Sequence, residues 1–420
     1  MGRSFPPPRL PSGRLSQLFN SPLLDLKPVL HLIPSIAPAH GGSTTAVLGM
    51  VRALRDQGTD ARIVSTDDDV GQRMNVTLGR WVEHEGLPVW FIPRIPVRQH
   101  TLVGFTYAPE FGPWLQRHLG DYSFLHLHTV FSYPSSVAAR QAFRRQLPYA
   151  VSLLGQLCDW SLGQRSLVKR LHLSLVGRRN LNHAAFLHST SPMETRDAQA
   201  LGISSPVREI PLGVPLPKLY PGARKQIESE LGLPPGRTLA IFLSRIHEKK
   251  GIEMLLQSMA QLRGPELDLI VAGDGHPAYV QSLQDLARSL GVEDRVHWVG
   301  HVEGDRKWSL LAGSDFFVLP SYSENFGIVV IEALASGLPV VISDAVGLAD
   351  SVRAANLGLV TTPDPKALTE ALKAACLQTS DREKTAQRAR QYVAAHHSWE
   401  TVASQLMEAY EASQTLPSRS

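Results

Sequence analysis

The sequence contains little cysteine and no long apolar run. Its 420 residues include two cysteines, Cys158 and Cys376, whose separation matches no metal-ligand or redox motif. We therefore expect a reducing compartment, with both thiols serving as small core side chains. A membrane-spanning helix needs roughly 18 to 20 uninterrupted apolar residues, and even the apolar segment 316–342 is broken by Pro and Glu. The chain is not expected to span a membrane.

Charge is also sparse. Charged residues make up 19% of the chain, and the formal net charge is +4. No basic stripe interleaved with aromatic residues occurs, so nucleic acid is not an expected partner. Asp67, Asp68 and Asp69 contain the only Asp-x-Asp pattern, which we interpret as a solvated acidic loop. No clustered set of histidine ligands is evident, so we expect no bound metal.

The length and composition indicate two domains. A chain of 420 residues with 43% hydrophobic content is too long for one core and suits two domains of roughly 150 to 200 residues. Residues 1–28 contain six prolines and are expected to form a disordered leader. The predicted domains are 29–215 and 216–395, joined by a Pro-rich linker. Residues 396–420 are expected to form a helix that packs back on the first domain, followed by a tail.

The stretch Ser321–Glu332 is the most informative part of the chain. It follows a short apolar run that ends at Pro320, as a buried parallel strand does before it leads into a loop. Gly327 then opens a pattern with helical spacing. The stretch is thus strand, loop and helix, an arrangement that binds phosphate at the helix N-terminus. Glu324 and Glu332 flank that corner, where carboxylates suit sugar or ribose hydroxyls.

This stretch resembles the signature of a large family of retaining glycosyltransferases, family 4, with two facing Rossmann-like domains. The family motif is a Glu, seven residues and a second Glu, and it begins as Glu-x-Phe-Gly. Glu324, Asn325, Phe326, Gly327 and Glu332 reproduce it intact. The resemblance implies that Glu324 orients the donor sugar and Glu332 holds the nucleotide ribose, with backbone amides near 325–327 on the diphosphate.

The resemblance covers roughly residues 29–411. It implies an α/β fold of two facing Rossmann-like domains, the GT-B architecture, with an interdomain cleft and a C-terminal crossover helix from about 399 to 411. Alternating apolar strands and amphipathic helices in both halves agree with this fold class. The implied donor is a nucleoside-diphosphate sugar, UDP- or GDP-linked, used without a cofactor and with retention of anomeric configuration.

A second charged loop follows the first strand of the C-terminal half. Arg245 and Lys250 lie in a strand-to-helix connection, where a planar guanidinium and a compact ammonium can neutralise a diphosphate. They match the family's Gly-Arg, few residues, Lys-Gly motif, although Ser244 replaces the usual Gly. Lys249 is interpreted as a solvated residue.

Two weaker patterns complete the predicted donor site. Gly273 and Gly275 form a Gly-Asp-Gly turn after the next strand, without the third glycine of the dinucleotide fingerprint. A plain turn would explain them, and relatives place this turn beside the nucleotide. The loop at His301 and Val302 is expected to reach the base through backbone groups.

The N-terminal half offers fewer motifs. Gly41 and Gly42 form a strand-to-helix turn that can approach a phosphate or serve as an ordinary turn. His126 and His128 share one face of a strand. His128 matches the position of a cleft histidine near the transferred sugar, and His126 is interpreted as core. Leu154 stands where relatives carry Arg, which puts one charge contact in doubt.

Residues 164–182 form a basic amphipathic segment. Two interpretations stay open: a solvated helix face with a buried apolar side, or a surface in peripheral contact with an anionic membrane. The expected location is cytoplasmic, on the inner face of the plasma membrane under the second interpretation. The basic residues of the segment are Arg165, Lys169, Arg170, Arg178 and Arg179.

The sequence therefore predicts a glycosyltransferase. Arg245 and Lys250 would stabilise the leaving diphosphate, and His128 would steady the developing charge on the sugar. The acceptor is expected to be a saccharide or lipid-linked saccharide in cell-surface polysaccharide biosynthesis. The alternatives are a glycogen- or sucrose-synthase-type transferase and a sugar-nucleotide-binding scaffold without catalysis. A two-domain sugar-nucleotide epimerase fits the Glu motif poorly.

Overall fold

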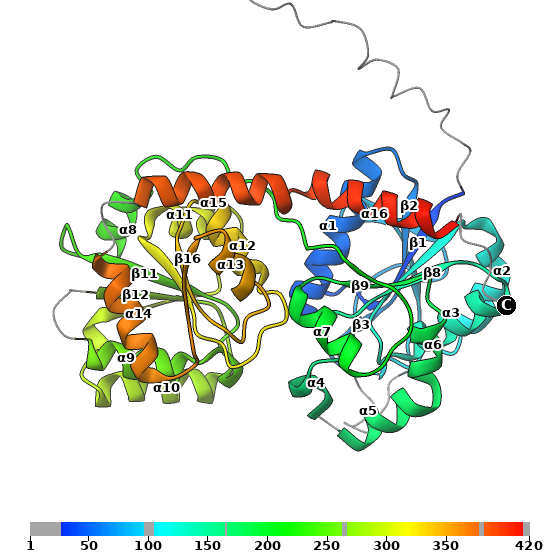
Figure 1. The fold of residues 1–420 in the computed structure, drawn as a ribbon, viewed down its shortest axis with the longest axis horizontal. Helices are drawn as coiled ribbons and strands as arrows, with labels where there is room; N and C mark the ends of the chain where they lie inside the picture. The colour runs from blue at the N-terminus through cyan, green and yellow to red at the C-terminus, as the bar shows by residue number, and fades with distance from the viewer. Residues whose placement is uncertain (1–26, 96–104, 164–165, 263–266, 378–381, 415–420) are drawn as a thin grey trace, which may run out of the picture.

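The protein consists of two α/β halves connected side by side (Figure 1). The computed structural model describes residues 27–95, 105–163, 166–262, 267–377 and 382–414. Residues 1–26 of the predicted leader, and Arg165 of the basic segment, lie outside these described residues. None of the described helices combines the length and the apolar character that crossing a bilayer requires.

The N-terminal half is built on an eight-stranded sheet with the order β10-β9-β8-β7-β1-β2-β6-β5. All neighbours are parallel except β5, which pairs antiparallel with β6. Every residue of β1 and β7 is buried, as expected for strands covered by helices on both faces. The strands are β1 (Val29–Ser35), β2 (Ala61–Thr66), β5 (Trp81–His84), β6 (Leu87–Ile92), β7 (Phe124–His128), β8 (Tyr149–Ser152), β9 (Phe186–Ser189) and β10 (Val207–Glu209).

Helices of this half begin where the sequence supplies caps. Ser132 accepts a hydrogen bond from the Ser135 amide at the start of α3, and Ser191 does the same for Glu194 at the start of α7. A proline follows in the first turn of both helices. The helices are α1 (Gly42–Asp56), α2 (Phe111–His118), α3 (Tyr133–Arg144), α4 (Asp159–Gly163), α5 (Ser166–His172), a π-helical turn (Leu173–Gly177), α6 (Arg178–Asn182) and α7 (Pro192–Ala200).

The C-terminal half has a six-stranded parallel sheet with the order β13-β12-β11-β14-β15-β16. Numbered within the half, this is the 3-2-1-4-5-6 order of the doubly wound dinucleotide-binding fold. Its strands are β11 (Thr238–Leu243), β12 (Leu267–Ala272), β13 (Val296–Gly300), β14 (Phe316–Leu319), β15 (Val340–Ser343) and β16 (Gly358–Thr361). Around them lie α8 (Ala223–Leu231), α9 (Ile252–Gln261), α10 (Pro277–Ser289), α11 (Gly304–Gly313), α12 (Ile328–Ala335), α13 (Ala349–Ala354), α14 (Pro365–Leu377) and α15 (Arg382–His396).

The chain passes between the halves twice, and the two passages are bonded together. The Val214 amide on the outgoing segment donates to the His397 carbonyl on the returning one at 2.9 Å. The returning helix α16 (Trp399–Gln414) packs on α1 (Figure 1). A Cβ added at Gly213 would lie 2.5 Å from the Trp399 ring, so this glycine makes room for the indole. The predicted fold class, two Rossmann-like sheets with a crossover helix, is confirmed.

The exact domain boundaries stay a prediction. We keep 215/216 and 395/396 as proposed limits, because they fall at the two passages between the sheets.

The acidic triplet after β2 is not a solvated loop, and that interpretation is wrong. Asp67 and Asp68 are 2% and 3% exposed. Asp67 accepts a hydrogen bond from the Arg94 amide at 2.8 Å, and Asp68 pairs with the Arg94 guanidinium at 3.0 Å. The triplet enters a short hairpin, β3 (Asp68–Asp69) with β4 (Gln72–Arg73). Buried carboxylates are stable here because a buried guanidinium compensates them, and the sequence does not place Arg94 nearby.

Candidate active site

Each sheet has a point at which the strand order reverses, and the loops that leave the strands there are the natural place for a ligand. In the C-terminal half this point lies between β11 and β14, and in the N-terminal half between β1 and β7. The predicted residues of the Arg245 to Lys250 loop and of the 321–327 loop therefore meet at one corner. His128 is the last residue of β7 and lies at the corresponding corner of the other sheet.

Lys250 and Glu324 are in direct contact at the C-terminal corner. The Lys250 ammonium pairs with the Glu324 carboxylate, and their side chains are 13% and 19% exposed. The loops that carry them are fastened by a hydrogen bond from the Tyr322 amide to the Lys249 carbonyl. Gly251 has φ +70, and a Cβ there would lie 2.4 Å from the Pro320 carbonyl oxygen. The two predicted site residues thus share one half-buried charge pair.

Lys249 was predicted to be solvated, and that prediction is wrong. Its side chain is half-buried. Burial lowers the pKa of its ammonium group, and the Glu324 carboxylate partly offsets that effect.

Glu332 has a cationic partner that the sequence did not reveal. Its side chain is 8% exposed, and its carboxylate accepts from the Lys307 ammonium at 2.7 Å. Lys307 belongs to α11 and also lies over the Trp308 ring, 4.7 Å from its centroid. A buried carboxylate needs a cationic partner, because burial removes the water that would otherwise stabilise its charge. Lys307 and Glu332 are 25 residues apart, so no local sequence pattern links them. Only the folded structure identifies Lys307 as the partner.

The Gly-Asp-Gly turn supports the Arg245 loop. A Cβ on Gly273 would lie 1.9 Å from the Ser244 carbonyl oxygen, and one on Gly275 would lie 2.3 Å from the Ile246 carbonyl oxygen. The Ile246 amide donates to the Asp274 carbonyl at 2.7 Å. Both glycines are therefore explained by close backbone approach, and contact with a nucleotide stays a prediction. Arg245 itself is exposed beside this turn.

Asn325 reaches across to the N-terminal half. Its side-chain amide donates to the Thr190 hydroxyl at 3.3 Å, and its carbonyl accepts from the Ser191 hydroxyl at 3.2 Å. A Cβ on Gly155 would lie 2.7 Å from the Asn325 Cβ. This residue of the Glu motif is therefore a contact between the halves.

Glu194, which the sequence analysis missed, braces the same contact. Its side chain is 1% exposed, and its carboxylate accepts from the amides of Gly155 and Thr190. Burial raises the pKa of Glu194, and these hydrogen bonds partly offset that effect. The available signal was its position three residues after the Ser191 cap, which is typical of a capping box.

The other residues predicted to lie in the donor site have different environments. Phe326 is 3% exposed and belongs to the core, whereas Gly327 has φ +81 and caps α12. His301 is 63% exposed beside Glu303, and Val302 is partly buried. Their roles stay predictions.

Gly41 and Gly42 lie at the start of α1. Gly41 has φ +64, which favours glycine. A Cβ at either position would meet no atom within 4 Å, so open space lies above the turn. An anion could approach there, and this role too stays a prediction.

His128 is completely buried. Its Nε2 lies 3.0 Å from Nδ1 of His31, and its ring stacks on His126 with centroids 4.4 Å apart. Burial lowers the pKa of all three histidines, that of His31 to about 3, so they are neutral near pH 7. Nδ1 of His128 has no partner among the described residues. The ring therefore does not reach the surface in this conformation.

His126 belongs to a chain of buried hydrogen bonds with one direction. A carbonyl can only accept, so His188 Nε2 donates to Ile210 at 2.8 Å, and its Nδ1 accepts from Ser152 at 2.9 Å. Ser152 then accepts from His126 Nε2, and His126 Nδ1 accepts from the Tyr410 hydroxyl, both at 2.7 Å. His126 is core, as predicted. The chain links α16 to the outgoing segment after β10.

The three clustered histidines do not suit a metal ion. Nitrogen atoms of His31, His126 and His128 lie within 4.8 Å of one another. However, both nitrogens of His126 are already hydrogen-bonded. The His128 ring also stacks within 23° of parallel on His126 and within 16° on His31, so their in-plane lone pairs cannot converge on one point.

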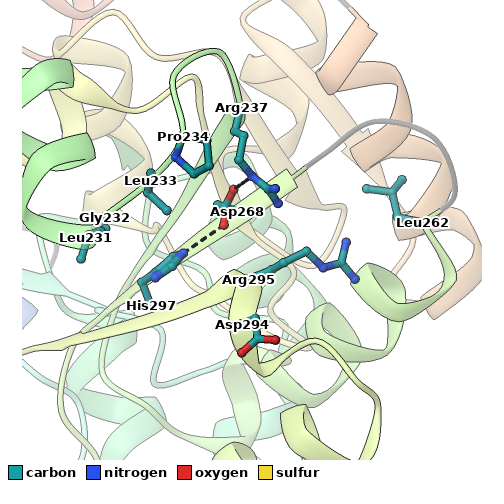
Figure 2. A pocket seen from close by; sticks show the side chains of 10 residues that line it. All are labelled: Leu231, Gly232, Leu233, Pro234, Arg237, Leu262, Asp268, Asp294, Arg295 and His297. Atoms are coloured by element: carbon teal, nitrogen blue, oxygen red, sulfur yellow. Dashed lines mark hydrogen bonds and ion pairs between the residues drawn. The ribbon is translucent and has the colours of Figure 1, made fainter.

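A cavity of about 490 Å³ lies elsewhere, at the amino ends of β12 and β13 (Figure 2). On its wall the Asp268 carboxylate accepts from Arg237 and, at 3.0 Å, from His297 Nε2. These contacts join the amino ends of β11, β12 and β13. Ligands of open α/β sheets bind at the opposite, carboxyl edge, so we do not assign the active site here.

Family models match both halves of the chain. Residues 223–392 match the model described as glycosyl transferases group 1, and residues 41–213 match a glycosyl transferase 4-like domain. A D-inositol 3-phosphate glycosyltransferase of Rhodococcus erythropolis is 30% identical over 304 residues, which cover 69% of this chain and 68% of that protein. A D-inositol 3-phosphate glycosyltransferase 2 of Catenulispora acidiphila is 32% identical over 59% of this chain and 60% of its own.

Solved structures share the fold. HepE of Anabaena, in complex with UDP and glucose, superposes with a TM-score of 0.73 at 22% identity and covers 92% of this chain and 100% of its own. Sucrose-phosphate synthase of Thermosynechococcus elongatus gives 0.74 at 24% identity and covers 92% and 98%. At this level of identity the likeness establishes the two-domain fold.

Proposed function

This chain belongs to the group 1 glycosyl transferases, and on that premise we propose that it moves a sugar from a nucleoside-diphosphate sugar to a saccharide or lipid-linked saccharide. It is a glycosyltransferase of the GT-B type. The proposal adds retention of anomeric configuration and transfer without a bound divalent metal. It also places the enzyme in the cytoplasm, in cell-surface polysaccharide assembly.

The observation that carries the proposal is the Lys250–Glu324 pair at the strand-order reversal of the C-terminal sheet. A half-buried ammonium at this corner can meet the diphosphate, where negative charge grows as the glycosidic bond breaks. Arg245, exposed on the same loop, supplies a second cation. Once the diphosphate pairs with Lys250, the Glu324 carboxylate becomes available to a sugar hydroxyl.

Glu332 binds another part of the donor, the nucleotide ribose, in this proposal. Its nearly buried carboxylate is held by Lys307 and retains lone pairs that can accept from ribose hydroxyls. Lys307 then fixes the carboxylate orientation before the nucleotide arrives.

We further propose that His128 meets the donor sugar from the N-terminal half. The supporting observation is its buried Nδ1, for which the described part of the chain supplies no partner, since a buried polar atom without a partner costs free energy until one arrives. Because the ring is fully buried, this role requires the loop that follows β7 to shift when the donor binds. Closing the two halves would then exclude water and limit donor hydrolysis.

UDP is the donor nucleotide that we propose first, because HepE, which shares the fold, binds UDP and glucose; GDP is the alternative. For the acceptor, the names of the relatives suggest two further compounds to test, D-inositol 3-phosphate and a sugar phosphate. A glycogen- or sucrose-synthase-type reaction would use such a soluble acceptor.

The test is a panel of UDP-, GDP- and ADP-sugars with the purified protein. Thermal shift reports binding, and NMR of the anomeric proton reports transfer or hydrolysis and its stereochemistry, with and without EDTA. One donor should stabilise the protein and be turned over with EDTA present. Glu324→Gln should lose turnover, whereas Glu370→Gln, exposed on α14, should not.

Two results would overturn the proposal. Binding of a sugar nucleotide without turnover, in the presence of all acceptors tried, would favour a binding scaffold. An inverted product or a loss of activity with EDTA would refute the retaining or metal-free part.

A further inference from the structure

A row of leucines on the N-terminal half faces solvent. Leu167, Leu171 and Leu175 are 82%, 60% and 68% exposed and recur every four residues along α5 and the π-helical turn. Leu173 and Leu181 lie on the buried side of the same segment. The segment therefore has a normal core-facing side and a second apolar side that the described residues leave uncovered.

The exposed row continues into neighbouring side chains. Val168 and Val176 flank it at 49% and 38% exposure, and Trp160 on α4 is 44% exposed. Single exposed apolar residues are ordinary, but contiguous groups of this kind mark a surface that meets a partner. We call the exposed face of residues 160–163 and 167–183, together with the neighbouring face of α3, the leucine-arginine face.

Positive charge is concentrated in the same part of the chain. Residues 122–193 contain eight Arg and Lys residues and one acidic residue, Asp159, whereas the rest of the sequence holds 34 basic and 37 acidic residues. The modest net charge of the whole protein therefore hides a strongly positive segment within an otherwise slightly negative chain. A partner of this face should be anionic as well as apolar.

A small pocket between α3 and α6 concentrates that charge. It has a volume of about 230 Å³, and its lining includes Arg140, Arg144, Arg179 and His183 together with the apolar wall of Leu175. None of the described residues that line it is acidic. Arginine forks suit phosphate oxygens, and the pocket opens beside the leucine row, which supplies one of its walls.

We propose that the leucine-arginine face docks on an anionic lipid bilayer. The leucines and valines enter the boundary between headgroups and acyl chains, and the pocket of Arg140, Arg144 and Arg179 takes a lipid phosphate. No described helix can span a bilayer, so the contact is interfacial. An amphipathic helix of this composition binds through buried apolar area together with attraction to anionic headgroups.

The chemistry of the face disfavours other occupants. A second copy that used the same face would bring two strongly positive surfaces together, which electrostatic repulsion opposes. Nucleic acid would leave the aliphatic row in water, since strand binding uses aromatic stacking platforms.

The position of the face fits the proposed function without depending on it. The segment 159–163 follows the carboxyl end of β8, the same sheet edge at which His128 ends β7. Figure 1 shows α4 and α5 projecting together below the N-terminal half. A docked protein would thus hold its predicted acceptor edge close to the membrane, where a lipid-linked acceptor resides.

The test is co-sedimentation of the full chain with vesicles of phosphatidylcholine alone or with 30% phosphatidylglycerol, at low and high salt. Binding should occur on the anionic vesicles and weaken as salt rises, because exposed charges are screened. Leu171→Ser with Leu175→Ser should reduce binding at least tenfold. Arg140→Ala, Arg144→Ala and Arg179→Ala together should reduce it about a hundredfold, at roughly fivefold for each charge.

Matched controls lie outside the face. Leu219→Ser and Leu377→Ser replace leucines that are 81% and 67% exposed elsewhere, and they should leave vesicle binding unchanged. All variants should retain the wild-type melting temperature and the donor-induced thermal shift. That second measurement separates a failure of lipid docking from a failure of the proposed transferase.

The proposal is wrong if the wild type ignores anionic vesicles at low salt, or if the control leucines matter as much as Leu171 and Leu175. Light scattering distinguishes the other occupant: a dimer that Leu171→Ser dissociates would assign the face to a second copy of the chain.

Discussion

The two halves share a strand order at their centres but place opposite kinds of side chain at the point of reversal. Between β11 and β14 the loops bring together a charged pair, Lys250 and Glu324. Between β1 and β7 the equivalent corner holds the neutral, fully buried His128, whose ring contacts the equally buried His31 inside β1. Topology therefore fixes where a ligand can bind, whereas the residues at the strand ends decide what it can be.

The difference matches the two parts of a sugar nucleotide. A diphosphate needs cations in a partly desolvated corner, where charge interactions are stronger than in water. A sugar is neutral until its bond breaks, so neutral groups suit it until then. Substitutions at each corner test this division.

Removing the charge at the C-terminal corner should have the largest effect. Lys250→Met keeps the length of the aliphatic stem and removes the ammonium that we place on the diphosphate. Turnover per bound donor should fall by about two to three orders of magnitude, the range for loss of one electrostatic stabiliser. Steady-state transfer kinetics measure it, with Lys366→Met, exposed on α14, as the control. A loss below threefold would remove Lys250 from the mechanism.

Removing the histidine at the other corner should separate chemistry from nucleotide binding. His128→Ala should lower kcat by about one to two orders of magnitude, below the range of a full acid or base, and leave the donor Kd within about threefold. Transfer kinetics and nucleotide titration give the two values, and His396→Ala, exposed on α15, is the control. Equal losses in kcat and donor affinity would show that both corners bind the nucleotide.

Acid should destabilise the N-terminal half through its buried histidines. Burial lowers the pKa of His31 to about 3 and of His188 to about 4, so below pH 6.5 the unfolded chain binds protons that the folded chain refuses. The stability that depends on neutral His31 and His188 is fully present above pH 6.5. It is lost as the pH falls toward the pKa values of the folded protein, at up to about 1.4 kcal/mol per pH unit for each histidine.

Urea unfolding at pH 7.5, 6.0 and 5.0 measures this slope. His31→Leu should reduce it by about one proton relative to the wild type. An unchanged slope would mean that His31 titrates normally in the folded protein.

Cutting the hydrogen-bond chain should have the smallest effect. Tyr410→Phe removes the hydroxyl that donates to His126 Nδ1 and leaves that buried nitrogen without a partner, at a cost of about 1 to 2 kcal/mol in unfolding free energy. Urea unfolding measures it. In the control, Tyr220→Phe, the lost bond to Asp305 is exposed, and the unfolding free energy should stay close to the wild-type value. Equal losses of unfolding free energy in the two variants would show that the buried hydrogen-bond chain adds no stability.

Much of the fold was predictable because its signals are local. Apolar strand runs, helix periodicity and the Glu324 to Glu332 spacing lie within short windows, and they gave two parallel sheets and the loop that unites the motif. The donor-site residues themselves remain predictions. Their meeting at the reversal of strand order follows from the sheet.

The predictions that were wrong concern side chains whose partners lie far away in the sequence. The Asp67 to Asp69 triplet looks solvated until Arg94 is placed against it. Likewise, the outward turn of Leu167, Leu171 and Leu175 cannot be read from periodicity, because a helix with two apolar sides does not state which one is covered.

The strands, the helices, the glycine turns and the family motif can be read from the sequence alone, because backbone propensity and side-chain period act over a few residues. The pairing of charges, as for Lys307 with Glu332, and the burial of His128 depend on how distant parts of the chain pack together. The physical reason is that desolvation and ion pairing depend on what lies within a few ångströms in space, and strand order brings together residues that no local window contains.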